Sequence, residues 1–465
     1  MTDLKIQRQV TFIVAGVASF AVPFMASAIN VALPSIGTEF SLSAVAQGWI
    51  VTAYILATAV GLLPAGRIAD MVGKKEIFVL GMAVFALGSM VSALSTSYAV
   101  LLASRIVAGI GSAMSFATGT AILMSVASLQ ERGRVLGWNV AAVYIGLSLG
   151  PTLGGIIIHE LGWEWVFGIG ALAGLLTVVL AAWALKRESA DSRGESLDVT
   201  GAMFWCVALI GLLYGLTRLP MPLGIALVGL GSFCLAAFVW WEYRSKSPLL
   251  DVSAFSQNPA FIFSNLAALI NYSSTMAVVF LLNLYLQYQR GLTVRQAGLI
   301  LVIQPIVMTI VSPISGRLSD RIAPGKLAST GMALTVVVLV AFSFLGRDTS
   351  LWLLGAGLAV LGLCFGLFSS PNMNAVMSSV GKKHYGVASS TLATMRVVGQ
   401  ALSMGITTLI MALYLGSAKI TPDNLPAFMR SMRVAFAVSA ILCVAGTFAS
   451  MSRGRAKAEP LTSGG

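Results

Sequence analysis

Long apolar runs separated by short polar stretches follow one another along almost the whole chain of 465 residues. The runs are continuously apolar rather than alternating, which predicts helices and argues against a β-barrel. A helix needs about 20 apolar residues to cross the ~30 Å hydrocarbon core of a bilayer. By that criterion we expect fourteen spans, at residues 10–34, 46–66, 77–96, 99–127, 135–158, 165–185, 199–218, 222–241, 260–288, 296–316, 327–345, 351–378, 386–415 and 431–451.

The composition supports a membrane protein. Hydrophobic residues make up 57% of the chain and charged residues 10%, with a mean hydropathy of +0.89, whereas soluble domains average about 25% charged residues. The four cysteines lie singly inside apolar runs without metal-ligand spacing, so we interpret them as apolar filler. Residues 26–28 ("ASA") resemble a signal-peptidase site. Because the apolar run continues to Pro34 and many similar runs follow, we expect an uncleaved first span.

The basic residues are distributed unevenly among the polar connections. In a soluble protein the net charge of +12 would suggest a nucleic-acid partner. An even number of spans puts both termini on one side, and the positive-inside rule assigns that side to the cytoplasm. Twenty of the 29 lysines and arginines then face the cytoplasm, seven face outward, and two lie inside spans. We therefore expect a cytoplasmic-membrane protein with both termini cytoplasmic and no nucleic-acid partner.

Two similar charged motifs stand at related positions. "GRIADMVGKK" (66–75) follows the second expected span, and "GRLSDRIAPGK" (316–326) follows the tenth. If the seventh and eighth spans are an inserted pair, the rest forms two blocks of six with the motif at matching places, as in transporters built from parallel repeats. We therefore predict an all-α integral membrane protein made of two pseudo-symmetric six-helix bundles. The expected divisions are a first bundle (1–186), a linker with two inserted helices (187–258), a second bundle (259–452) and a cytoplasmic tail (453–465).

The chain resembles the major facilitator superfamily, specifically its fourteen-span drug:proton antiporter branch. The resemblance covers nearly the whole chain and is carried, in order, by "NVALP" (30–34), "GRIADMVGKK" (66–75), "RIVAGIGSA" (105–113), "GLSLGPTLGG" (146–155), "WEWVF" (163–167) and "SPLLDVSAF" (247–255). It implies a major-facilitator-type fold that works by alternating access, with the substrate between the two halves near the midplane. It also implies efflux of drug-like molecules in exchange for protons, as in multidrug resistance.

The resemblance gives the charged motifs a role as a conformational latch. It implies that Asp70 lies against the N-terminus of a helix from the other half, where the helix dipole favours an anion. Gly66 and Gly73 are expected to permit a tight turn between helices. The alternative is a topology signal without a gating role. The predicted latch residues are Gly66, Arg67, Asp70, Gly73, Lys74, Gly316, Arg317, Asp320 and Arg321.

The segment 146–155 resembles the antiporter motif of that family, which is tied to export. Glycines without side chains along one helix face let another helix approach closely, and a proline bends the span. The alternative is ordinary packing of small residues. The residues concerned are Gly146, Gly150, Pro151, Gly154 and Gly155.

Two arginines are expected inside spans, where a cation costs about 2.5 kcal/mol or more. Arg105 matches a family arginine associated with proton coupling, and its alternative role is a structural clamp on backbone carbonyls of the first span. Arg396 either faces the substrate cavity or anchors a helix end.

The chain departs from the family at one position. The related antiporters carry an aspartate five residues before the asparagine of the "NVALP" segment, and here that position is Met25. All seventeen Asp and Glu residues map to loops, span ends or tails. Protons could use Asp70 or an edge acid such as Glu160 or Glu164, or coupling could be weak or absent. This departure favours neutral or anionic substrates over organic cations.

Uncharged polar residues gather in the ninth expected span and in several others. Asn265, Tyr272 and Asn283 share one face at helical spacing. Polar groups in hydrocarbon are costly unless bonded, so these residues line a wet cavity or staple helices together. The candidates for the cavity are Asn30, Asn139, Tyr144, Asn265, Asn271, Tyr272, Asn283, Gln304, Asn372, Asn374 and Arg396.

Three functions fit the sequence. The first is a proton-driven exporter of small amphipathic molecules, the second an organic-anion or neutral-solute carrier that does not need the gradient, and the third a transport-dead sensor or scaffold. No P-loop, catalytic motif or metal-ligand cluster is found, so we expect neither an enzyme nor a bound cofactor. The expected partners are a small-molecule substrate, protons and membrane lipid, with the protein as a monomer.

Overall fold

The structure is a computed structural model that describes residues 2–125, 132–185, 197–219, 221–245, 248–250, 258–319, 321–380, 385–416 and 418–453. These residues form helices and connecting turns without any strand. The first half contains α1 (Thr2–Glu39), α2 (Ala44–Val72), α3 (Lys74–Ala93), α4 (Tyr98–Ser125), α5 (Arg132–Leu161) and α6 (Glu164–Ala184). The inserted pair is α7 (Val199–Arg218) and α8 (Pro222–Glu242). The second half contains α10 (Pro259–Leu284), η1 (Tyr285–Gln289), α11 (Val294–Leu301), α12 (Ile303–Leu318), α13 (Pro324–Ser343), α14 (Leu351–Ser378), α15 (Tyr385–Leu415), η3 (Pro422–Asn424) and α16 (Leu425–Ser452).

The helices match the expected spans one for one. Thirteen of them are long and apolar enough to cross a membrane, and α5, at the fifth expected span, contributes a shorter apolar stretch at Ile145–Leu161. The ninth span ends in a π-helical turn at Tyr285–Gln289. The tenth is divided at Val302 into α11 and α12. Pro305 explains the division, because it lacks the N–H that would bond the Leu301 carbonyl and its ring crowds that group.

The two six-helix bundles repeat one neighbour pattern. In the first bundle, α1 packs on α5 and α6, α3 packs on α4 and α6, and α2 packs on α4. In the second bundle, α10 packs on α15 and α16, α13 packs on α14 and α16, and α12 packs on α14. The same neighbours in the same order are the mark of a parallel repeat related by pseudo-two-fold symmetry.

The repeat extends to individual close contacts. A Cβ atom at Gly146 of α5 would lie 2.5 Å from the Phe20 carbonyl oxygen of α1. A Cβ atom at Gly399 of α15 would lie 2.5 Å from the Leu269 carbonyl oxygen of α10. In both bundles a glycine therefore brings the fifth helix against the backbone of the first helix, an approach that any side chain would block.

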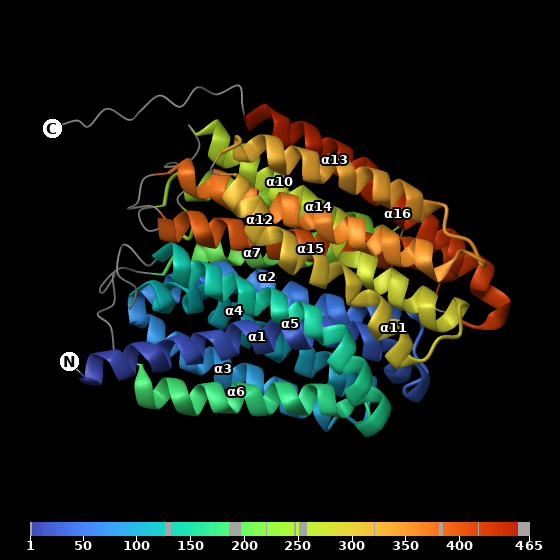
Figure 1. Cartoon of the computed structure of the whole chain (residues 1–465), viewed down its shortest axis with the longest axis horizontal. Helices are drawn as coiled ribbons and strands as arrows, with labels where there is room; N and C mark the ends of the chain where they lie inside the picture. Colours follow the sequence, from blue (N-terminus) through green and yellow to red (C-terminus); the bar gives the residue numbers. More distant parts are fainter. Residues whose placement is uncertain are drawn as a thin grey trace.

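The long helices run between two ends of the molecule (Figure 1). The terminal end holds the beginning of α1, the end of α16 and the turn between α2 and α3; the far end holds the end of α1, the beginning of α2 and α11. The bundles meet along two seams, α2 against α15 and α5 against α11 and α12. The inserted α7 packs on both α2 and α15, and the Trp205 indole N–H donates to the Ala59 carbonyl of α2 at 3.3 Å. The inserted pair therefore lies across the first seam.

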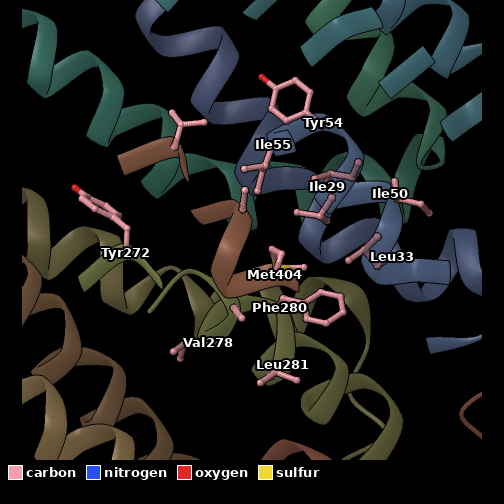
Figure 2. Packing of buried hydrophobic residues seen from close by; sticks show 14 of the residues in the cluster. Ile29, Leu33, Ile50, Tyr54, Ile55, Tyr272, Val278, Phe280, Leu281 and Met404 are labelled. Carbon is pink, nitrogen blue, oxygen red and sulfur yellow. The ribbon is translucent and has the colours of Figure 1, made fainter. Parts of the chain in front are cut away.

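A single cluster of buried apolar side chains joins the bundles. Figure 2 shows Ile29 and Leu33 of α1 and Ile50 of α2 in this cluster together with Phe280 of α10 and Met404 of α15. Large apolar side chains also cover the outside of the molecule, for example Trp352, which is 89% exposed. Because soluble proteins rarely expose extended apolar surface, this outer surface fits hydrocarbon. The structure is that of a multi-pass membrane protein.

Candidate functional site

Hydrogen bonds between the bundles gather at the far end. The Asn283 amide of α10 donates to the Asn30 carbonyl of α1, and the Gln287 amide donates to the Val31 carbonyl at 3.2 Å and to the Asn283 amide oxygen at 2.8 Å. At the beginning of α2, the Gln47 amide donates to the Tyr288 hydroxyl at 3.1 Å. Side chains of the second bundle thus bond α1 and α2 near their far ends, and the bundles are held together there. Sequence analysis did not single out Gln47 or Tyr288.

Both seams are also closely packed at this end. On the first seam, a Cβ atom at Gly48 of α2 would lie 2.9 Å from the Thr408 hydroxyl of α15. On the second seam, Gly298 of α11 lies against the Pro151 carbonyl of α5, and a Cβ atom at Gly155 would lie 3.2 Å from the Val294 carbonyl oxygen. Glycines therefore allow backbone contact between the bundles, which closes the far end.

The predicted antiporter-motif glycines serve two faces of α5. Gly146, Gly150 and Gly154 lie against α1, where Cβ atoms at Gly150 and Gly154 would lie 2.5 Å from the Ser27 Cβ and 2.7 Å from the Ala28 Cβ. The expectation that Gly155 shares this face is wrong, because Gly155 lies against α11 of the other bundle. The motif therefore fixes α5 on α1 with three glycines and meets the second bundle with the fourth glycine and with Pro151.

Several predicted cavity residues act as staples. The Ser19 hydroxyl of α1 donates to the Asn139 amide oxygen of α5 at 2.5 Å, and the Asn374 amide donates to the Ser319 hydroxyl at 2.9 Å. Asn30 donates to the Ala26 carbonyl of its own helix at 3.1 Å. Of the three residues expected on one face of α10, Asn283 is part of the far-end closure. The Tyr144 side chain lies outside the described residues.

A second group of predicted cavity residues keeps unsatisfied polar atoms. Asn271 of α10 is only 1% exposed, and neither its amide nitrogen nor its amide oxygen has a hydrogen-bond partner among the described residues. The amide oxygens of Asn265 of α10, Gln304 of α12 and Asn372 of α14 are also buried without a donor. Buried polar atoms are normally bonded, so atoms without a protein partner mark where an external group can bind. We call these four residues, which come from α10, α12 and α14, the amide cluster; the name describes their shared unsatisfied amide oxygens and not a common position.

An aromatic and cationic group lies on the neighbouring turns. The Arg396 guanidinium of α15 lies 5.4 Å from the centroid of the Tyr272 ring, and the Tyr272 ring meets the Phe365 ring of α14 edge to face at 6.1 Å. Tyr272 directly follows Asn271 on α10, and Phe365 shares α14 with Asn372, whereas Arg396 comes from α15. Such a set can contact a planar, polar molecule through stacking, hydrogen bonds and a positive charge.

Arg105 is buried inside the first bundle with no exposed surface. Its Nε–H donates to the Ile50 carbonyl at 3.4 Å, and its guanidinium lies 4.1 Å from the centroid of the Tyr54 ring and 5.5 Å from that of Phe167. The clamp expected on the first span is therefore placed wrongly: the acceptor belongs to α2. Figure 2 shows Tyr54 and Ile50 on this part of the first bundle.

Met25 occupies the position at which the related antiporters carry an acid. It is fully buried, and its sulfur accepts a hydrogen bond from the Ser89 hydroxyl of α3 at 3.5 Å. A Cβ atom at Gly170 of α6 would lie 2.8 Å from the same sulfur. The position thus lies among α1, α3 and α6, where an ionised acid would be strongly desolvated.

The first charged motif forms a one-residue turn. Gly73 has φ +132°, which favours glycine, and it is the residue between the end of α2 at Val72 and the beginning of α3 at Lys74. The expectation that Gly66 takes part in the turn is wrong, because Gly66 lies inside α2. Arg67 and Asp70 occupy the last two turns of α2 and therefore lie at the terminal end.

The second charged motif has a different local structure. Gly316 and Arg317 lie in the last turn of α12, where a Cβ atom at Gly316 would lie 2.8 Å from the Ser370 hydroxyl of α14. Arg321 follows in an exposed turn, and Asp320 lies outside the described residues. The two motifs occupy equivalent turns, but the second needs several residues where the first needs one glycine.

The terminal end also contains a buried acid that sequence analysis did not single out. Glu242, the last residue of α8, is 3% exposed. Its sequence signal was a carboxyl group directly after a long apolar run. Among the described residues no cluster of His, Cys, Asp and Glu could hold a metal ion.

Comparison with known proteins is consistent with this architecture. The family model described as Major Facilitator Superfamily matches residues 15–404, and a second match covers residues 264–464. "Riboflavin transporter RibZ" of Clostridioides difficile (strain 630) is 29% identical, covering 95% of this chain and 96% of the relative. "Methylenomycin A resistance protein" of Bacillus subtilis (strain 168) is 30% identical, covering 83% of this chain and 84% of the relative. "Multidrug resistance protein Stp" of Mycobacterium tuberculosis (strain CDC 1551 / Oshkosh) is 28% identical, covering 89% and 77%.

Proposed function

Because the chain belongs to the Major Facilitator Superfamily of transporters, as the match over residues 15–404 shows, we propose that it exports small amphipathic molecules by alternating access. Proton antiport supplies the driving force in this proposal, and the cytoplasmic membrane is the location. The observation that carries the proposal is the far-end closure, in which Asn283, Gln287 and Tyr288 of the second bundle bond α1 and α2 of the first.

The distribution of charge gives this closure a direction. In the topology expected from the sequence, twenty of the 29 basic residues lie on the side of the termini, which the positive-inside rule assigns to the cytoplasm. In this proposal the far end is the outer end, and the far-end closure supports a conformation that is closed to the outside. A single intramolecular hydrogen bond contributes only about 1 kcal/mol net, so a few such bonds can hold this state and still break in each cycle.

The amide cluster supports a substrate with several hydrogen-bonding groups. Asn271 can donate and accept, Asn372 can accept, the Tyr272 and Phe365 rings can stack, and Arg396 favours a neutral or negatively charged molecule. Two relatives are named for riboflavin and for methylenomycin A, and a relative from Streptomyces glaucescens is named "Tetracenomycin C resistance and export protein". We therefore propose planar, oxygen- and nitrogen-rich molecules as the substrate class.

A second candidate function keeps this site and removes the proton. Met25, buried where the related antiporters carry an acid, and Arg396 beside Tyr272 favour a carrier for neutral or anionic solutes that does not depend on the gradient. In both cases the latch at Arg67 and Asp70 would close the cytoplasmic end when the far end opens.

Flux measurements test the proposal. Proteoliposomes containing the full chain are loaded with riboflavin, methylenomycin A or tetracenomycin C, and flux is followed with and without an imposed pH gradient. We expect flux of at least one compound and acceleration by the gradient. A flux that is the same with and without the gradient favours the second candidate function. If no anionic, neutral or cationic compound is transported in a broad screen, both candidate functions are contradicted.

The site itself is tested with two variants. Asn271→Leu removes both unsatisfied amide atoms without changing the far-end closure, and it is expected to raise KM strongly. Asn139→Leu, whose amide bonds Ser19 within the first bundle, is the matched control and is expected to leave KM unchanged. An unchanged KM in the Asn271 variant would remove the amide cluster from the substrate site.

A further inference from the structure

Two carboxyl groups of the inserted helices lie together at the terminal end. Asp198 caps the N-terminus of α7 and is 9% exposed, and Glu242 ends α8 and is 3% exposed. A Cβ atom at Gly201 would lie 2.7 Å from a Glu242 carboxyl oxygen and 3.0 Å from an Asp198 carboxyl oxygen. The two carboxyl groups therefore lie side by side over the first turn of α7. We call them the carboxyl pair.

The hydrogen bonds of the pair are unevenly divided. The Asp198 carboxylate accepts from the Gly201 N–H at 2.8 Å and from the Trp241 indole N–H at 2.9 and 3.0 Å. Glu242 Oε2 accepts from the Leu250 N–H at 2.9 Å, whereas Glu242 Oε1 is buried and has no donor. An ionised carboxylate only accepts hydrogen bonds, while a protonated one carries an O–H that can donate. One proton on Glu242 would therefore turn the orphan oxygen into a donor beside a second carboxyl group.

Like charges held this close also favour a bound proton. Two adjacent carboxylates in a buried site cannot both ionise at low cost, because their repulsion is poorly screened. Aspartic dyads in other proteins share a proton for this reason. The pair differs from exposed acids such as Glu160 at the far end, whose side chain is 61% exposed.

One charged residue of the latch interacts with the pair. The charge of Arg67 acts on the Glu242 carboxyl group, more weakly than the neighbouring Asp198 does. It belongs to the first charged motif on α2 and lies one helical turn before Asp70. Among the described residues, Asp198 of α7 and Arg67 of α2 are the charged groups that act on Glu242, and the segment 248–250 supplies the backbone N–H groups of Leu249 and Leu250. The ionisation state of the pair therefore changes the field at the latch.

We propose that the carboxyl pair Asp198–Glu242 is a proton-binding site by which the inserted helices control the latch through Arg67. The proton comes from water at the terminal end and returns to it, and the O–H bond of Glu242 is the bond that forms and breaks. With the proton bound the pair carries one negative charge, and without it two. The ionised pair holds Arg67 towards α8, and the protonated pair releases it. The inference rests on the latch role given to Arg67 in the proposed function.

Infrared spectroscopy tests the proton site without any transport. The full-length protein in lipid nanodiscs is titrated from about pH 5 to about pH 9, and the C=O stretch of protonated carboxyl groups is followed. We expect a band that titrates in the wild type, is absent in Glu242→Gln and persists in Glu160→Gln. Glutamine keeps the size of Glu242 and can still accept from the Leu250 N–H, so the variant should fold. A titrating band that is unchanged in Glu242→Gln overturns the proton site.

Arg67→Gln tests the electrostatic link. Removing a positive charge beside the pair makes ionisation harder, so the midpoint of the infrared titration is expected to move to higher pH. A structural role of Arg67 alone would leave the midpoint in place, and that result would overturn the link between the pair and the latch.

Control of the latch is measured as a distance. Val72 at the end of α2 and Ile322 in the α12–α13 turn are exposed. Both are changed to cysteine in a variant whose four native cysteines are replaced by alanine. Spin labels on the two new cysteines then report the distance between positions 72 and 322. The wild-type pair is expected to give a pH-dependent distance distribution, and Glu242→Gln the acid form at every pH. A pH response that survives in Glu242→Gln overturns control by the pair. Because neither measurement needs substrate or a gradient, gradient-independent flux would contradict the antiporter while leaving this proposal standing.

Discussion

Asn283 is the side chain through which the far-end closure can be weakened most selectively. Its amide donates to the Asn30 carbonyl of the other bundle, and its amide oxygen accepts from Gln287 at 2.8 Å. Asn283→Ala removes both bonds and leaves the contact of Gln287 with Val31 in place. The change is confined to the end of α10, so the amide cluster around Asn271 keeps its structure.

The expected magnitude follows from the bond that spans the bundles. The bond between Asn283 and Gln287 lies within the second bundle, so it does not distinguish the closed far end from the open one. The bond to the Asn30 carbonyl contributes about 1 kcal/mol net. At about 1.4 kcal/mol per factor of ten, the population of the open conformation should rise about fivefold.

Labelling of a buried cysteine measures this shift. Leu33 of α1 is fully buried in the cluster that joins the bundles (Figure 2), and Leu33→Cys should react with a membrane-impermeant maleimide only when the far end opens. While the open form is rare, the rate of labelling is proportional to its population. Asn139→Ala, which breaks a hydrogen bond inside the first bundle, is the matched control. Equal labelling rates in the Asn283→Ala and Asn139→Ala backgrounds would refute the far-end closure.

Two further predictions concern stability. Gly150→Val places side-chain atoms against Ser27, because a Cβ atom alone would lie 2.5 Å from the Ser27 Cβ. Overpacking of this kind costs about 1–3 kcal/mol, so we expect a lower Tm in detergent. The control Gly229→Val, at a position with open space, is expected to keep its Tm. Burial lowers the pKa of Arg453 to about 9, and its three guanidinium nitrogens have no acceptor. Because a depressed pKa means that folding opposes the charged form below about pH 9, Arg453→Met should raise the Tm at neutral pH, whereas a lower Tm would contradict the unpaired burial of this arginine.

Hydropathy alone predicted the helices of this protein because lipid imposes one length and one polarity on every span. The interruption at Val302 was the exception, since a proline inside an apolar run can bend, break or leave a membrane helix intact. Gly66 was assigned to the turn because a glycine allows an unusual backbone conformation without requiring it. In the structure Gly73, with φ +132°, adopts such a conformation.

The roles of polar residues depended on distances between helices that no local pattern records. Asn283 and Asn271 are both asparagines on α10, but the Asn283 amide donates to the other bundle, whereas the Asn271 amide has no hydrogen-bond partner in the part of the chain that the structure describes. Arg105 was expected on carbonyls of the first span and donates instead to Ile50 of the second. In each case the outcome is decided by which helix stands opposite, and by the rotation of that helix.

The inserted helices break the symmetry of the two seams, and this has a mechanical consequence. The pseudo-two-fold relation makes the α2–α15 seam equivalent to the α5–α12 seam. Only the first seam is covered by α7, which bonds α2 through Trp205 and packs Leu213 of α7 against Gly405 of α15, where a Cβ atom would lie 3.5 Å away. Opening at that seam must either carry α7 and α8 with one bundle or break contacts with the other, whereas the second seam can open along the glycine faces of α5 and α11. The Trp205 bond favours movement of the inserted pair with the first bundle, whose charged motif contains Arg67. The carboxyl pair then stays beside the first bundle throughout the cycle, so it can act on Arg67 of the latch in either conformation.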